Sequence, residues 1–539
     1  MQDLATLPRD IKHYILQFLT DPRDFYNLNL TCQELRHDAL PFYYNTVHVN
    51  GNVALPVLAA GLVPTNPGLQ QLRHLVIKEP YRDDPIECQC QHCPMHSNTD
   101  TALTLLANLL PYDRLLTFTC DCVLPLPSLI LATLYRRQPK LRTLRLDSFH
   151  LDPVIASLSQ GRLANIATVY ICTSDPSEAS FWNRVLPTLS NLRNLEVIAS
   201  ADRFDGVYPL TADASSEVLA KLLDWTSQKS HYKLHLHTLQ VQGFDLTDAA
   251  ETLRRHIHFP GLQVLGIQLC PNSVRLVEIL YETHELGRLS LRTLILVEAE
   301  KSPESRLHNP ALSRLLSTFG TLEHLFVRTK GSAAYWPDLP AVAGHAASLR
   351  LLHLDCLVPR SSGQQRRGSA LQKLHKLEQF ALPMSRIDLV AADCCATAPS
   401  YRELRGLLTC LNALPSLRTL QMLDMRLYDA EVVQNDQNFV RGFLLRHTRT
   451  LADYVFSAVA HLKAFSFERF NYRHTNKNYW ESCSGRCYHR GRIIDALGRE
   501  QTTAIEASLQ ELKQIEPAVD ILDMEDLEHG GLFRYGYEL

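Results

Sequence analysis

A six-residue pattern, apolar at its first, fourth and sixth positions, recurs along this chain and constrains its fold more than any other feature. The copy at residues 141–146 reads Leu-Arg-Thr-Leu-Arg-Leu, so its second half alternates apolar and polar side chains. Such alternation is typical of a short β-strand with one buried face. One strand of this kind cannot bury its own apolar face, so the recurrence predicts a stack of similar units.

Thirteen copies of this hexad can be aligned. Most neighbouring copies start 25 to 31 residues apart, and four gaps are 40 to 45 residues long. The spacing matches the period of about 20–29 residues of leucine-rich repeats, stretched in places. Between the hexads there is room for helices, for example at residues 216–225 and 401–414, where leucines recur at helical spacing. We therefore expect an α/β leucine-rich-repeat solenoid over residues 71–470, with parallel strands on its concave face and helices outside.

Composition agrees with a soluble, elongated protein. The 539 residues include 45% hydrophobic residues and no long low-complexity linker, and the formal net charge is -3. This balance gives no general attraction to nucleic acid or to anionic membranes, so we expect neither as a partner. The longest apolar stretch, residues 53–63, is too short for a membrane span of about 20 helical residues. No secretory signal is evident, which favours reduced thiols for the 14 cysteines and a cytoplasmic or nuclear location.

The first 46 residues differ in character from the repeats. After Leu7-Pro8, apolar residues recur at helical spacing until Asp21-Pro22 stops the pattern. Two more short helices are expected, one over residues 25–30 and one containing Leu35 and Ala39. A module this small buries little apolar surface by itself, so it is expected to share that surface with a partner or with the next element, a linker at residues 47–70.

This N-terminal pattern resembles the F-box, a three-helix motif that docks on the Skp-type adaptor of cullin-RING ubiquitin ligases. The resemblance covers residues 4–46 and includes the Leu-Pro start, Asp10, the Asp-Pro break and Cys32 before the last helix, whereas Leu35 stands where the family commonly has an aromatic residue. It implies adaptor contacts from Leu7, Pro8, Ile11, Ile15, Leu16, Leu19, Leu28, Leu30 and Leu35. The alternative is a small helical cap that closes the first strand of the solenoid.

The polar positions within the hexads are candidates for binding a target. The third and fifth residues, with the residue that follows, point away from the core and should line the concave face. Exposed apolar side chains beside arginine are common at the centres of protein interfaces. The candidates are Tyr170, Ile295, Val297, His324, Phe326, Arg328, His353 and Asp355. The alternative is that a loop or the C-terminal segment covers these residues.

One insertion is rich in possible metal ligands. Cys88, Cys90, Cys93 and His96 lie within nine residues, and thiolate with imidazole is the ligand set of structural zinc sites. Two ligands only one residue apart strain a single tetrahedron, so a reduced cysteine-rich loop is the favoured interpretation. We expect no cofactor, with a structural zinc ion as the alternative.

Residues 471–539 are expected to form a C-terminal cap and an acidic tail. Residues 501–515 place Ile505, Leu509, Leu512 and Ile515 at helical spacing, which predicts one helix closing the open end of the solenoid. Residues 516–528 are acidic without a basic residue, and we expect them to be mobile or to lie over a basic patch.

Sequence motifs of catalysis are missing. The chain has no phosphate-binding Gly-x-x-x-x-Gly-Lys-Ser/Thr loop, no Gly-x-Ser-x-Gly elbow and no His-Glu-x-x-His zinc helix. We therefore expect a protein that is not an enzyme. The resemblance implies the substrate-recognition subunit of an SCF-type ubiquitin ligase, which holds the adaptor, through it the cullin, and an unknown protein substrate. The alternative is a leucine-rich-repeat scaffold whose F-box serves an assembly without ubiquitin transfer.

Overall fold

A computed structural model describes the chain over residues 4–19, 21–50, 66–78, 108–121, 128–146, 164–173, 176–199, 212–224, 233–286, 289–298, 305–329, 338–355, 370–383, 399–423, 426–427, 437–467, 470–473, 480–483 and 486–523. The chain divides into a first unit, Met1–His258, and a second unit, Phe259–Leu539. The sequence pattern does not indicate this division, because the hexad continues across it.

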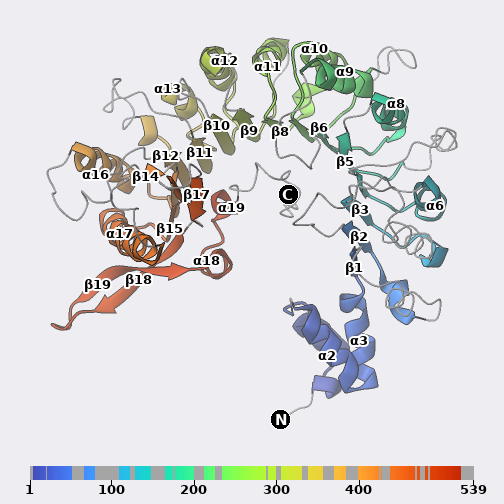
Figure 1. Ribbon diagram of the computed structural model, residues 1–539, viewed down its shortest axis with the longest axis horizontal. Coiled ribbons are helices and arrows are strands. Elements are labelled where there is room, and N and C mark those ends of the chain that lie inside the picture. Colours follow the sequence, from blue (N-terminus) through green and yellow to red (C-terminus); the bar gives the residue numbers. More distant parts are fainter. Residues whose placement is uncertain are drawn as a thin grey trace. The chain divides into compact units, whose positions relative to one another are not determined.

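The first unit opens with three α-helices and continues with strands that alternate with helices (Figure 1). Its helical elements are η1 (Leu4–Thr6), α1 (Arg9–Leu16), α2 (Pro22–Thr31), α3 (Gln33–Tyr43), η2 (Pro67–Gln71), α6 (Ser128–Arg137), α8 (Pro176–Val185), η4 (Leu186–Thr188), α9 (Ala212–Leu223) and α10 (Ala249–His256). Its strands are β1 (Thr46–Asn50), β2 (His74–Lys78), β3 (Thr117–Asp121), β4 (Thr143–Leu146), β5 (Thr168–Thr173), β6 (Asn194–Ala199) and β7 (Thr238–Gln242).

The second unit repeats the same alternation and ends in a different way. Its helical elements are η5 (Phe259–Gly261), α11 (Val274–Leu286), α12 (Ser305–Thr318), α13 (Leu339–Ala343), α16 (Pro399–Asn412), α17 (Gln437–Ala458), α18 (Leu509–Ile515) and α19 (Asp520–Asp523). Its strands are β8 (Val264–Gln268), β9 (Thr293–Glu298), β10 (His324–Thr329), β11 (Leu351–Asp355), β12 (Gln379–Pro383), β13 (Thr419–Leu423), β14 (Arg426–Leu427), β15 (Ala464–Phe467), β16 (Phe470–Arg473), β17 (Trp480–Cys483), β18 (Arg486–Ile494) and β19 (Glu500–Ala507).

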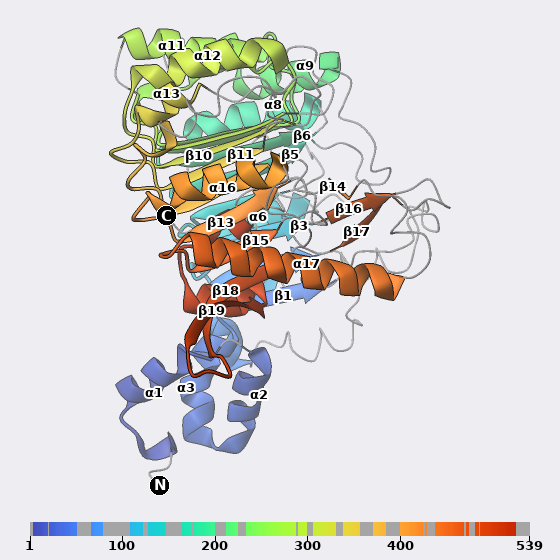
Figure 2. The ribbon, with the colours of Figure 1, turned by 90° about the vertical axis from the view of Figure 1, so that its left-hand side faces the viewer.

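Strand pairing follows the hexad register within each unit. In the first unit β1 to β7 pair in chain order and in parallel, and the third residue of each hexad aligns with the third residue of the next, as in Thr117 with Thr143. In the second unit β8 to β13 and then β15 do the same, as in Thr293 with His324 (Figure 2). The prediction that the hexads are parallel strands is therefore confirmed.

The apolar hexad positions form the cores of both units. Every first, fourth and sixth residue of the thirteen hexads is buried, and Leu144 at 4% exposure is typical. Helices such as α8 and α9 in the first unit, and α11 and α12 in the second, pack beside one another on one side of the strands (Figure 1). We call the opposite side, which carries the third and fifth hexad residues, the inner face. The expected helices at 216–225 and 401–414 exist as α9 and α16, each beginning earlier than expected.

The prediction of one helix over residues 501–515 is wrong in its first half. Residues 500–507 form β19, which pairs antiparallel with β18, and a helix begins only at Leu509. Ser508 ends the strand and starts the helix, because its hydroxyl accepts a hydrogen bond from the Glu511 N–H and the Glu511 carboxylate accepts one from the Ser508 N–H. The turn of the hairpin places Gly498 at φ +75°, a conformation that glycine adopts without strain.

Candidate protein-interaction surfaces

The three N-terminal helices form a small module with its own core. Asp21 caps α2, since its side chain accepts a hydrogen bond from the Arg23 N–H at 2.8 Å. Leu16, Phe25 and Ala39, one from each helix, are buried together, and the Phe25 ring lies parallel to that of Phe42 at 6.0 Å between centroids. Figure 2 shows the three helices packed as one bundle. Asp21 therefore starts α2, which begins at Pro22 and not at the expected residue 25.

A buried ion pair joins α1 to α3. The Lys12 ammonium lies 2.5 Å from a carboxylate oxygen of Asp38, and these residues are 8% and 4% exposed. Arg9 and His13 approach the other carboxylate oxygen at 3.6 and 3.8 Å. A charge buried this deeply is stable only with a close partner. The face of α1 turned toward the module interior therefore carries a cation.

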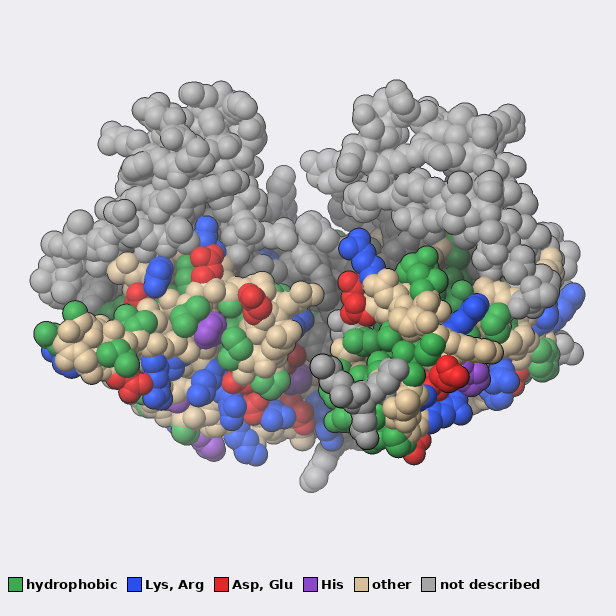
Figure 3. Space-filling view, turned by 90° about the horizontal axis from the view of Figure 1, so that it is seen from below, with side chains coloured by type: hydrophobic (Ala, Val, Ile, Leu, Met, Phe, Trp, Pro, Cys, Tyr) green, Lys and Arg blue, Asp and Glu red, His purple; other side chains and the backbone are tan. Residues whose placement is uncertain are grey.

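Large hydrophobic side chains are exposed on α1, just after its end, and on α2. Their exposed fractions are 48% for Ile11, 61% for Tyr14, 67% for Phe18, 53% for Tyr26 and 68% for Leu30. Figure 3 views the molecule from the end at which these helices are drawn in Figure 1, and hydrophobic side chains are visible at the surface in its right half. We call these five residues the exposed module patch. Large exposed apolar side chains gathered on one small module are candidates for an interaction site.

The expected adaptor contacts fall into three groups. Pro8, Ile11 and Leu30 are exposed, and Leu7, Ile15, Leu19 and Leu28 are half-buried. Leu16 and Leu35 are only 2% and 6% exposed. These two residues hold the helices together and are not accessible in this structure, so their burial argues against direct adaptor contact.

The pattern analysis omitted three members of the exposed module patch. Tyr14 lies three residues after Ile11 on the same face of α1. Phe18 follows just after the end of α1, and its ring lies edge-on to that of Tyr14 at 5.0 Å between centroids. Tyr26 lies on α2, four residues before Leu30. The sequence carries no signal for them, because a lysine is normally exposed and the burial of Lys12 against Asp38 is visible only in the structure.

On the inner face of the first unit, Tyr170 is buried. Its ring lies under the guanidinium of Arg145, 3.9 Å from the ring centroid, and the two residues are register partners on β5 and β4. Tyr170 is 5% exposed and Arg145 is 9% exposed. A cation over an aromatic face is a favourable contact, so this pair stabilises the neighbouring strands. Neither side chain is presented to a partner in this structure.

The inner face of the second unit is covered as well. Ile295, Val297 and Phe326 are between 1% and 4% exposed, although they occupy hexad positions that point away from the helices. They cluster with Leu512 of α18 and with Val519, Ile521 and Leu522 of the C-terminal segment. This arrangement matches the alternative in which the C-terminal segment covers the expected target-binding residues.

The remaining expected target contacts lie in the same layer. His353 is 2% exposed and its ring stacks on Phe326 at 3.9 Å between centroids. Arg328, 8% exposed, pairs with the half-buried Asp355 at 2.9 Å. Burial lowers the pKa of His353 well below its usual range, and the nearby Arg328 charge lowers it further. Burial also lowers the pKa of the half-buried His324, and the carboxylates of Glu323 and Asp520 oppose this shift.

Hydrogen bonds fix the C-terminal segment on the inner face. The Gln379 amide on β12 donates to the Asp520 carboxylate at 2.8 Å and accepts from the Ile521 N–H at 2.8 Å. The Thr419 hydroxyl on β13 donates to the Ala518 carbonyl. The Arg418 guanidinium lies 3.6 Å from the Glu516 carboxylate, which is itself buried. The acidic segment is therefore docked as far as Leu522, mainly by apolar side chains and main-chain contacts.

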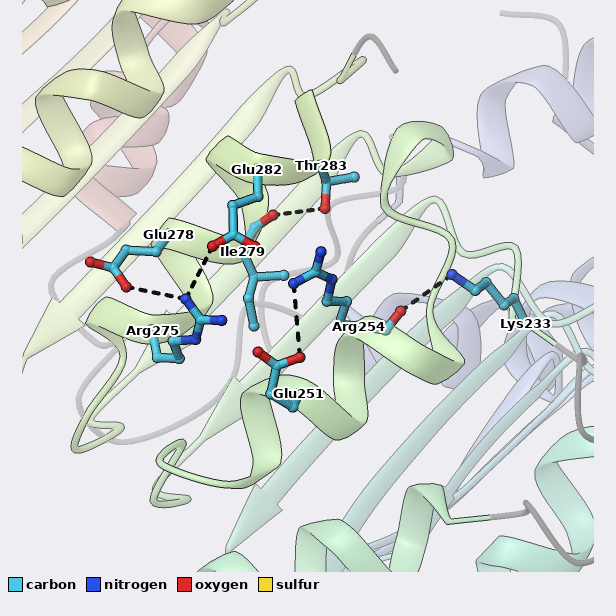
Figure 4. A network of polar contacts seen from close by, with 8 residues as sticks. All are labelled: Lys233, Glu251, Arg254, Arg275, Glu278, Ile279, Glu282 and Thr283. Carbon is cyan, nitrogen blue, oxygen red and sulfur yellow. Dashed lines mark hydrogen bonds and ion pairs between the residues drawn. The ribbon is translucent and has the colours of Figure 1, made fainter. Parts of the chain in front are cut away.

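The outer helices carry ion pairs that are confined to single helices. On α11, Arg275 lies between Glu278 and Glu282 at 3.4 and 3.1 Å, and on α10 Arg254 lies 3.9 Å from Glu251 (Figure 4). All of these side chains are more than a third exposed. Exposed pairs of this kind contribute little to stability. They form solvated helix surfaces and do not assemble a site.

The described residues form neither a metal site nor a membrane-spanning helix. No group of three or more His, Cys, Asp or Glu side chains there could hold a metal ion. Cys88, Cys90, Cys93 and His96 lie outside the described residues. Within the same part of the chain, none of the helices has the length and hydropathy needed to cross a bilayer.

Comparison with known proteins gives little further guidance. The sequence matches no protein-family model and no curated protein. A solved structure described as the crystal structure of the Rad7 and Elc1 complex in yeast resembles the chain with a TM-score of 0.33 and 14% sequence identity, over 75% of this chain and 94% of that chain. A likeness of this strength does not establish a common fold. Functional inference rests on the residues and contacts described above.

Proposed function

We propose that this protein is the substrate-recognition subunit of an SCF-type cullin-RING ubiquitin ligase. In this proposal the N-terminal helices are an F-box that binds the Skp-type adaptor, and the leucine-rich repeats bind a protein target. The observation that carries the proposal is the exposed module patch. A three-helix module that buries Lys12 and exposes Ile11, Phe18 and Leu30 is suited to a protein partner with an apolar groove.

The proposed division of work gives this chain no chemical step. Ubiquitin transfer would belong to the other subunits, while this chain would bring the target close to them and orient it. Consistent with that role, the hydrophobic residues at the first, fourth and sixth hexad positions are buried in the core. The module patch offers exposed apolar side chains to the adaptor, outside the repeats.

Adaptor binding is tested by changing the exposed patch without disturbing the module core. The double variant Ile11→Ala, Leu30→Ala removes two exposed side chains on α1 and α2. Interface hot spots lose about 2 kcal/mol or more on truncation, so we expect adaptor affinity to fall at least ~30-fold. Isothermal titration of the full chain with purified adaptor measures the change.

Ile494→Ala is the matched control, because Ile494 is 76% exposed but lies on β18 in the second unit. It should leave adaptor affinity unchanged. Equal affinities for wild type, the double variant and the control would refute the proposal. Co-purification separates ligase from scaffold, since cullin should accompany the adaptor in a ligase and should be missing in an assembly without ubiquitin transfer.

A further inference from the structure

The C-terminal segment at residues 516–523 contacts the second unit as a bound peptide would. It contributes a short helix, α19, and irregular backbone to a surface built by strands far away in sequence, and Gln379 lies 141 residues before its partner Asp520. Figure 1 draws α19 on the side of the strands away from α16. The segment adds no strand to the sheet and packs its side chains onto the inner face.

Main-chain recognition is the first component of this contact. Gln379 binds both the backbone and a side chain of the segment. Its amide oxygen accepts a hydrogen bond from the Ile521 N–H, and its amide nitrogen donates one to the Asp520 carboxylate. Thr419, one strand further along, binds the Ala518 carbonyl. Both Gln379 and Thr419 are buried polar residues at third hexad positions. Polar side chains that form hydrogen bonds with both the backbone and the side chains of a segment are typical of peptide-binding surfaces.

Apolar contacts and charge are the second component. Val519, Ile521 and Leu522 are at most 5% exposed and join a cluster with Ile295, Val297 and Phe326. The Arg418 guanidinium, more than half exposed, approaches Glu516 at one end of the segment. Within the segment, between Val519 and Ile521, Asp520 accepts from Gln379 and acts electrostatically on His324. The surface therefore favours a carboxylate at two positions of a bound segment. One lies before the aliphatic residues, as Glu516 does, and the other lies between them, as Asp520 does.

We propose that this inner face is the target-binding site, that residues 516–523 occupy it as an intrinsic ligand, and that the target supplies a short acidic and aliphatic peptide of the same chemistry. This inference rests on the proposed function, since it identifies the target class for the same repeats. The sequence Glu-Pro-Ala-Val-Asp-Ile-Leu-Asp of the segment defines the expected pattern.

Competition follows from the covalent connection of the segment. A segment joined to its site through a short link has an effective concentration in the millimolar range. A target in solution must compete with the attached segment for the site. Its apparent affinity is therefore its intrinsic affinity multiplied by the fraction of molecules in which the site is open. Releasing the segment should therefore strengthen binding of an added peptide.

The experiment uses the full chain and a fluorescein-labelled synthetic peptide of residues 516–523 as the probe. The double variant Val519→Asp, Ile521→Asp releases the segment by placing carboxylates in the apolar cluster. Fluorescence anisotropy should show the variant binding the probe at least ~10-fold more tightly than wild type. Adding Gln379→Ala to the release variant should weaken probe binding again, because both contacts to Gln379 are lost.

Equal probe affinities for wild type and the release variant, or no binding by either, would overturn the inference. If the release variant does not fold, hydrogen exchange of the wild-type chain decides. Amides of residues 519–522 should exchange at least ~10-fold faster than those of β12, because the segment opens without unfolding the sheet. Exchange as slow as that of β12 would show a permanent part of the core and overturn the inference.

The two proposals fail separately. Loss of probe binding with intact adaptor binding would remove the inner-face site and leave the proposed function standing. Intact probe binding with no adaptor binding by the wild-type chain would remove the proposed function and leave a peptide-binding repeat protein.

Discussion

The N-terminal module and the inner face of the second unit both carry large apolar side chains, and they differ in what covers them. In the module, Phe18 and Leu30 are 67% and 68% exposed. On the inner face, Phe326 and Ile295 are each 1% exposed beneath the C-terminal segment. The same kinds of side chain therefore have opposite environments.

The difference is that a segment of the same chain covers the inner face of the second unit. Residues 516–523 bring their own carboxylates and aliphatic side chains to the inner face, where Gln379 and Thr419 bind the backbone. The module has no equivalent among the described residues, and α1 turns its cation inward instead. The exposed module surface is therefore a candidate for binding another protein, whereas the inner face is already covered by a segment of its own chain.

The largest effect should come from breaking the charge pair that orients α1. Lys12→Ala leaves the Asp38 carboxylate buried, with the longer contacts from Arg9, His13 and His37. Removal of one partner of a buried pair is strongly destabilising, and we expect a loss of about 3 kcal/mol in module stability. Hydrogen exchange of α1 and α3 amides in the full chain measures it.

The double variant Lys12→Met, Asp38→Leu is the control for this change. Replacing both charges by apolar side chains of similar size removes the desolvation cost as well as the pairing, so module stability should stay close to wild type. If the single and double variants are equally unstable, the ion pair does not set the orientation of α1.

The inner face should lose stability on acidification. His353 is neutral in the folded protein, since burial holds its pKa well below the ordinary value of 6.5. Between that folded-state pKa and 6.5 the unfolded chain binds more protons, so stability falls as pH falls through this window and is constant above it. Each unit of lowered pKa corresponds to about 1.4 kcal/mol.

Urea unfolding of wild type and His353→Leu at pH 7.5 and pH 5 measures the contribution of this histidine. The variant should show a smaller loss of stability between the two pH values, because it removes the group that must take up a proton. His375→Leu, which removes an exposed histidine of the same unit, is the matched control. If the free energy of unfolding of His353→Leu depends on pH as that of wild type does, other titratable groups cause the effect.

The smallest effect is expected at the start of α18. Ser508→Ala removes the hydroxyl that accepts from the Glu511 N–H at 3.2 Å. Loss of such a cap costs about 1 kcal/mol, and α18 leads directly into the docked segment. Hydrogen exchange should become faster in α18 and in residues 519–522, with no change in α1. Unchanged exchange in residues 519–522 would show that the segment docks independently of α18.

Much of the fold follows from local pattern. The hexad positions alone predict the strands, their parallel pairing and the burial of residues such as Leu141 and Leu144. The three N-terminal helices follow from apolar spacing and from the Asp21-Pro22 break. Short-range periodicity is sufficient here because each strand buries the same face against the next repeat.

The local sequence pattern predicts the structure wrongly where a segment packs against a distant part of the chain. Residues 501–507 carry helical spacing but pair with β18, because an edge of the sheet was available at the end of the repeats. The candidate site shows the same limit. Tyr170, Ile295 and Phe326 occupy positions that point away from the helices, yet contacts from elsewhere in the chain bury them.

The sequence by itself determined the repeating strands, the buried hexad positions and the separate character of the first 46 residues, because these depend on spacing over a few residues. Tertiary structure alone decided which apolar surface stays open. The burial of Lys12 against Asp38 turns Ile11 and Phe18 outward, and the return of residues 516–523 to strands some 140 residues earlier closes the inner face. Such choices depend on which distant segment reaches a surface, and no periodicity within either segment records them.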